Sequence, residues 1–222
     1  MKTTLLSTVA AFAACLTAGA DVTTTFGTLS GATFASHSVA SNAVEITTIT
    51  DLPGSPSDTV VLGLSATPRG ALAPLLSNNG AGAFVAQAGT ANGGALWDLD
   101  FYIGVANSDF ANYSFTLLYG PEGSPLVSYT GLATIPDNSG APTSAQNSEN
   151  LSFPFLGAAI AFNPDALATY DFDLVAYNAA GTELGASDIT VTTRSVADSA
   201  STLVLLALVL PGLALVKRFT TA

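Results

Sequence analysis

The chain has 222 residues, of which 49% are hydrophobic and only 9% are charged, and its formal net charge is −11. Five basic side chains are too few to neutralise a run of phosphates, so nucleic-acid binding is excluded. One histidine and one cysteine also exclude a zinc site built from several His and Cys ligands.

The first 20 residues have the order of a secretory signal peptide. Lys2 supplies a positive charge, residues 5–14 are mostly apolar, and the small residues Ala18 and Ala20 stand where signal peptidase reads a cleavage site. We therefore predict cleavage by signal peptidase after Ala20. Lipidation of Cys15 is the alternative to this processing.

Cleavage after Ala20 would remove the only cysteine, so the exported domain could form no internal disulfide. Between residues 21 and 198 stand all 16 acidic side chains but only two arginines, Arg69 and Arg194, a formal balance of 14 negative charges. Such a surface favours solubility outside the cell and repels other polyanions.

Residues 21–195 have the pattern of short strands separated by clusters of Gly, Pro, Asn and Ser, and helix signals are nearly absent. The predicted strands span residues 22–29, 43–50, 59–65, 83–88, 96–105, 112–119, 125–135, 151–162, 170–176 and 184–191. Residues 51–58 and 136–149 are expected to be surface loops. About ten strands predict an all-β fold, a single antiparallel β-sandwich or jelly-roll-like domain.

The strand at 96–105 alternates strictly between apolar and polar side chains. One face carries Trp97, Leu99, Phe101 and Ile103, and the other carries Asp98, Asp100 and Tyr102. We expect the first face in the core and the second in solvent. Because residues 107–109 have turn chemistry, an antiparallel hairpin with the strand at 112–119 is predicted.

A second hairpin is predicted near the end of the domain, where residues 170–176 and 184–191 flank a loop. Gly181 supplies the positive φ that such a loop often needs. The apolar positions of the returning strand change phase near Gly185, which predicts a β-bulge.

Candidate catalytic residues are few. His37 has no partner in a Gly-x-Ser-x-Gly motif. The pairs Asp98/Asp100 and Asp171/Asp173 have a spacing of about 7 Å on a strand face, which a glycosidase could use, but we favour a solvated strand face, since the outward face of an alternating strand is polar in any case. Calcium binding stays open, because acidic side chains are abundant but no Asp-x-Asp-x-Asp-Gly loop appears. We predict no catalytic activity, no cofactor and no metal site.

A rival function is carbohydrate binding or glycan hydrolysis. It would use exposed aromatic side chains, Tyr102 and Tyr177, with Asp100 and Asp173 nearby.

The last 27 residues have three parts: a polar motif at 196–202, an apolar run at 203–216, and the basic pair Lys217 and Arg218. From Ser201 to Val216 a helix would rise about 24 Å, against roughly 30 Å for the hydrocarbon core of a bilayer. It has no polar face, which disfavours packing against a soluble domain. We predict a short transmembrane helix, with the basic pair left on the cytoplasmic side.

This order of motif, apolar helix and basic pair resembles the PEP-CTERM class of sorting domains, in the variant whose motif begins Val-Pro-Asp-Ser. The matching residues are Val196, Asp198, Ser199, Ser201 and Thr202, followed by Lys217 and Arg218, and Ala197 replaces the proline. The resemblance implies recognition and processing by an exosortase, a transpeptidase-like membrane enzyme of Gram-negative bacteria that make extracellular polysaccharide. An uncleaved anchor is the alternative.

The body of the chain also resembles domains that commonly precede such a tail, at residues 146–151, 162–166 and 169–172. That resemblance implies a location but no activity. The sequence thus predicts a structural or adhesive component of the cell surface or extracellular matrix, with polysaccharide as an expected partner.

Overall fold

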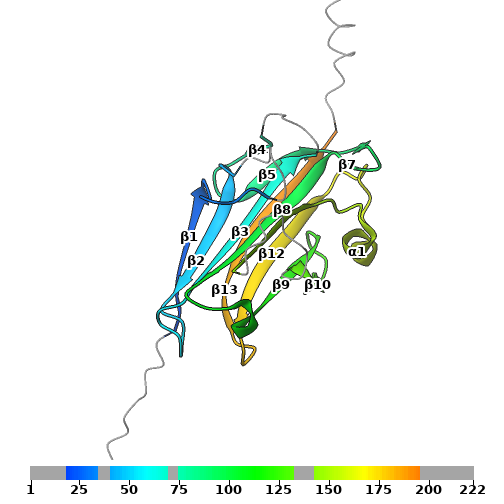
Figure 1. The fold of residues 1–222 in the computed structure, drawn as a ribbon. Helices are drawn as coiled ribbons and strands as arrows, with labels where there is room; N and C mark the ends of the chain where they lie inside the picture. Colours follow the sequence, from blue (N-terminus) through cyan, green and yellow to red (C-terminus); the bar gives the residue numbers. More distant parts are fainter. Residues whose placement is uncertain (1–18, 35–40, 70–74, 133–142, 196–222) are drawn as a thin grey trace, which may run out of the picture.

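The computed structural model describes residues 19–34, 41–69, 75–132 and 143–195, and their fold is all-β (Figure 1). The first main sheet contains, in spatial order, β1 (Asp21–Gly27), β2 (Val44–Thr50), β3 (Thr59–Pro68), β8 (Trp97–Ala106) and β11 (Ser144–Glu149). The second contains β10 (Val127–Tyr129), β9 (Tyr113–Pro121), β12 (Thr169–Asn178), β13 (Glu183–Arg194), β5 (Ala83–Gln87) and β4 (Ser77–Asn78). A small third sheet pairs β6 (Thr90–Ala91) with β7 (Gly94–Ala95).

Short helical segments lie between strands of the described residues, and the second and third of them are contiguous. They are η1 (Phe110–Asn112), α1 (Pro154–Gly157) and η3 (Ala158–Ile160). The two main sheets pack face to face around one large core.

The predicted alternation of β8 is confirmed on its core side. Trp97, Leu99, Phe101 and Ile103 are all buried. The Trp97 ring contacts the rings of Phe172 and Tyr170 on the opposite sheet, with centroid distances of 6.1 and 6.2 Å. Aromatic contacts of this kind add to the burial energy that joins the two sheets.

The predicted hairpin between β8 and β9 is wrong. β8 belongs to the five-stranded sheet and β9 to the six-stranded sheet, and the connection between them passes through η1. Both strands turn their apolar face toward the same core, from opposite sides. The turn residues therefore carry the chain from one sheet to the other, which period-two patterning alone does not distinguish from a hairpin.

The predicted hairpin near the end of the domain is confirmed. β12 and β13 pair antiparallel, and Gly181 in their connection has a φ of 76°. Ala176 pairs with Gly185 but Tyr177 pairs with Glu183, so one residue of β13 is left over at the expected bulge.

The sequence predicts an antiparallel sandwich, and this is wrong for one pair of strands. In the six-stranded sheet β13 pairs with β5 in parallel. Parallel neighbours require a long crossover connection. Here that connection includes all the strands from β6 to β12, which belong to both main sheets and to the small third sheet.

Two of the weaker assignments are also wrong. Residues 144–149, predicted to be part of a loop, form β11 at the edge of the five-stranded sheet, paired with β8. Residues 151–162, predicted to be a strand, contain α1 and η3. Of the range 125–135, only Val127–Tyr129 is strand among the described residues. The strands predicted at 22–29, 43–50, 59–65 and 83–88 are present as β1, β2, β3 and β5.

The outer face of the five-stranded sheet is covered by the chain that follows β1. Phe34 there is fully buried, and the backbone N–H groups of Thr33 and Phe34 donate to the Gln146 side chain of β11. Gly63 of β3 permits this close approach, since a Cβ atom at that position would lie 2.7 Å from Leu29. Polar residues of β8 on this face are therefore shielded from water.

Candidate functional site

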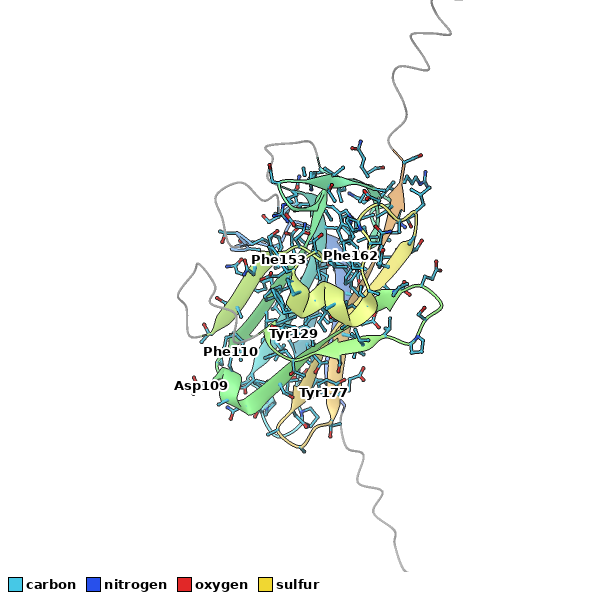
Figure 2. The ribbon with its side chains drawn as sticks, turned by 90° about the vertical axis from the view of Figure 1, so that its right-hand side faces the viewer. Asp109, Phe110, Tyr129, Phe153, Phe162 and Tyr177 are labelled. Carbon is cyan, nitrogen blue, oxygen red and sulfur yellow. The ribbon has the colours of Figure 1, made fainter. Side chains whose placement is uncertain are left out.

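Three aromatic rings contact one another in series, and Figure 2 shows two of them, Phe153 and Tyr129, on the same side of the domain. Phe155 stands between the other two, with its centroid 5.9 Å from that of Phe153 and 5.6 Å from that of Tyr129. Phe153 and Phe155 are 37% and 44% exposed, although large hydrophobic side chains of the described residues are mostly buried. We call Tyr129, Phe155 and Phe153 the aromatic row. Neighbouring exposed apolar side chains of this kind make this surface a candidate binding site.

The row rests on a firmly held segment. Pro154 is the first residue of α1, where its missing N–H costs nothing. Leu156 is buried, and its carbonyl oxygen accepts a hydrogen bond from the Tyr119 hydroxyl at 2.8 Å. Gly157 lies so close to the Leu151 carbonyl that a Cβ atom there would overlap it. The backbone directly after Phe155 is thus fixed by buried contacts.

A charged pair closes one end of the row. The Arg69 guanidinium carbon lies 5.6 Å from the Phe153 ring centroid, within cation–π range. Its Nη1 atom is 3.7 Å from Oδ1 of Asp98, and the two side chains are 22% and 15% exposed. The pair is partly shielded from solvent, so the guanidinium is held beside the rings while part of it stays accessible.

Asn150 fixes the position of Asp98. Its amide nitrogen donates to Oδ1 of Asp98 at 2.6 Å and to the Trp97 carbonyl at 2.8 Å. Its amide oxygen accepts from the N–H groups of Ala95 and Ser152 at 2.9 and 3.0 Å. One buried side chain therefore joins β7, β8 and the segment that leads into α1.

Replacing Asn150 by alanine is expected to lower the free energy of unfolding by about 2 kcal/mol, because several buried backbone groups lose their partner. Urea unfolding followed by the fluorescence of Trp97 would measure the change. Asn163→Ala is the matched control, because Asn163 is exposed and its side chain caps only a local turn. Equal losses in the two variants would contradict the role given to Asn150.

The outer face of β8 is not solvated, contrary to our prediction. Asp100 is fully buried, and neither of its oxygens has a well-formed hydrogen bond among the described residues. Burial raises the pKa of Asp100 to about 8, although hydroxyls of Ser148 and Thr67 oppose the shift. The pKa of Asp98 is raised by burial and lowered less by Asn150 and Arg69.

Glu149 on the neighbouring strand β11 behaves similarly. Its pKa rises to about 7, first because it is buried and then because Asp98 is close, while the Asn147 amide favours the charged form. Burial is the largest cause of the raised pKa of each of the carboxyl groups Asp98, Asp100 and Glu149, and only Asp98 is linked to the aromatic row, through Arg69.

The site predicted for carbohydrate binding is not assembled as expected. Tyr102 and Asp100 lie on β8 in one main sheet, and Tyr177 and Asp173 lie on β12 in the other. Tyr102 packs against the buried cluster around Phe34. Asp100 is inaccessible to a ligand, because its side chain is fully buried.

The aromatic row was missed because the segment at 151–162 was predicted to be a strand. The residues Ser152-Phe153-Pro154-Phe155 carried a usable signal, since a proline between two phenylalanines is typical of a helix start and not of a central strand. Arg69 offered a second signal, as one of only two basic side chains between residues 21 and 198.

The predicted sorting residues Val196, Asp198, Ser199, Ser201, Thr202, Lys217 and Arg218 lie outside the described residues, as do Ala18, His37 and Cys15. Ala20 is described and packs against the core next to the first residue of β1. Within the described ranges no helix is long and apolar enough to cross a membrane. In the same ranges no group of three or more His, Cys, Asp or Glu side chains is placed to hold a metal ion.

Comparisons with models of known protein families and with curated proteins find no match to this chain.

Proposed function

We propose that the chain is an exported protein of the bacterial cell surface, held at the envelope by its C-terminal tail. In this proposal residues 21–195 form a non-catalytic structural or adhesive domain of the sandwich type outside the cell. The observation that carries the proposal is the apolar run at 203–216, bounded by a polar motif and a basic pair. A segment with no polar face is stable in lipid and unstable against an aqueous domain surface.

The boundaries of the folded domain support this division. β1 begins at Asp21, directly after the proposed signal peptidase site, and β13 ends at Arg194, just before the proposed sorting motif. These two residues lie at opposite ends of the sandwich (Figure 1). An anchor after Arg194 would hold that end near the membrane and direct the end with Asp21 outward.

Cell fractionation of two matched chains tests the proposal. The full chain is expected in the membrane fraction, and a chain ending at Asp198 is expected in the soluble or released fraction. A charged residue at the centre of the run, Ala207→Asp, should also release the chain, because it costs about 2.5–3.5 kcal/mol on insertion. Thr221→Asp, beyond the basic pair, is the control and should leave the distribution unchanged.

Intact mass distinguishes the two fates of the tail. A surface-extracted chain that ends before Leu203 indicates processing by an exosortase-like enzyme. A mass that includes residues 203–222 indicates an uncleaved anchor. Membrane association of the chain ending at Asp198 at the level of the full chain would overturn the proposal as a whole.

A further inference from the structure

We propose that the aromatic row is a binding platform for an uncharged polysaccharide, with Tyr129, Phe155 and Phe153 stacking on successive sugar rings. The inference names a partner class for the adhesive domain proposed above and rests on that function for its biological setting. It uses a surface different from the one that the sequence predicted.

The spacing and inclination of the three rings support contact with sugars. The C–H groups on one face of a pyranose are apolar and stack on the electron-rich face of an aromatic ring. Phe153 and Phe155 are inclined by only 25° to each other, and Tyr129 and Phe155 by 40°. Consecutive ring centroids lie 5.9 and 5.6 Å apart. Three neighbouring rings at this spacing, two of them partly exposed, offer apolar surface at intervals that a linear chain of sugars can contact.

The segment that carries the aromatic row is rigid, which favours binding. The Tyr119 hydroxyl and the buried Leu156 side chain hold the backbone directly after Phe155. Arg69 lies beside Phe153 and is itself held by Asp98. Side chains already fixed in position lose little rotamer freedom on binding, so even a small contact area can give measurable affinity.

Charge selects the class of ligand. Between residues 21 and 198, acidic side chains outnumber basic ones by 14, which repels nucleic acid and acidic polysaccharides. The same charge opposes a second copy of the chain at this surface, because two acidic domains would be brought together. An uncharged polymer is not repelled by this negative charge. The exposed part of the Arg69 guanidinium can donate a hydrogen bond to a sugar hydroxyl at the end of the row.

The test uses the full chain solubilised in mild detergent and two insoluble polysaccharides, cellulose and chitin, with soluble alginate as the anionic comparison. We expect saturable binding to at least one uncharged polymer and none to alginate. Phe155→Ala should raise the Kd about tenfold, as expected for a central aromatic contact, and adding Phe153→Ala should abolish detectable binding. Phe155→Trp should preserve binding.

Leu167→Ala is the matched control, because Leu167 is 65% exposed but lies outside the row, and its Kd should stay within about twofold of the wild type. Fluorescence of Trp97 confirms that each variant is folded. Absence of binding to both uncharged polymers, or equal binding by the double variant, would overturn the inference.

Analytical sedimentation tests whether a second copy of the chain, and not a polysaccharide, covers the aromatic row. A dimer that dissociates in the Phe155→Ala variant would show that the row joins two copies, which also overturns the inference. Binding in detergent does not depend on the tail. A negative polysaccharide result with normal membrane fractionation therefore refutes the platform alone, and the opposite pair of results refutes the anchor alone.

Discussion

Replacing Trp97 by alanine is expected to lower the free energy of unfolding by about 3–5 kcal/mol, the usual cost of removing a large buried aromatic side chain. Trp97 is 1% exposed and lies at the centre of the core. Its ring contacts Phe162, Tyr170 and Phe172, with centroid distances of 6.2, 6.2 and 6.1 Å. The substitution would leave a cavity between the two main sheets and remove contacts with the segment after α1.

Circular dichroism in urea would measure this loss, because the variant no longer contains tryptophan. The midpoint temperature should fall by roughly 10 °C, given about 2–4 °C per kcal/mol for a domain of this size. Trp97→Phe should lose less, since it fills part of the cavity. A loss below about 1 kcal/mol for the alanine variant would mean that the sheets do not depend on this residue.

The second large effect concerns pH, and its sign is opposite to that of an ordinary paired carboxylate. Burial raises the pKa of Asp100 from 3.8 to about 8. Between these values the folded chain keeps the proton and the unfolded chain releases it. Stability is therefore greatest near and below pH 4 and falls as the pH rises toward 8. Above pH 8 this contribution no longer changes.

Asp100→Asn should remove that pH dependence, because asparagine has nearly the same shape and does not ionise. At pH 7 the wild type is about three pH units above the ordinary pKa, which corresponds to at most about 4 kcal/mol. We expect the variant to be about 2–4 kcal/mol more stable than the wild type at pH 7 and no more stable at pH 4.

Urea unfolding at several pH values, followed by Trp97 fluorescence, would show the difference. Asp165→Asn is the matched control, because Asp165 is exposed and its replacement should leave the pH profile unchanged. An Asp100→Asn variant less stable than the wild type at pH 8 would contradict the prediction. The free energy of unfolding of the Asp100→Asn variant should still fall by a smaller amount as the pH rises, because the pKa of Glu149 is also raised, to about 7.

The aromatic row and the buried carboxyl groups of β8 show why the site could be predicted only in part. Asp98 and Asp100 could be placed together on one face of β8, because that follows from the period of a strand. Their burial could not be predicted, since it depends on residues of other segments, such as Ser148 beside Asp100 and Asn150 beside Asp98. The exposure of Phe153 and Phe155 likewise depends on a distant contact. Leu156 is buried and its carbonyl oxygen accepts a hydrogen bond from Tyr119, and the neighbouring phenylalanines are left at the surface.

Local patterns in the sequence determined the all-β class, the core face of β8, the hairpin of β12 and β13, and the bulge near Gly185. Each of these depends on side-chain alternation or on turn residues a few positions apart. Only the tertiary structure decided that β8 and β9 lie in different sheets, that β5 runs parallel to β13, and that polar residues 144–149 form a strand. Those outcomes depend on which strand edges meet across long stretches of chain, and backbone hydrogen bonds form there whatever the local side-chain pattern.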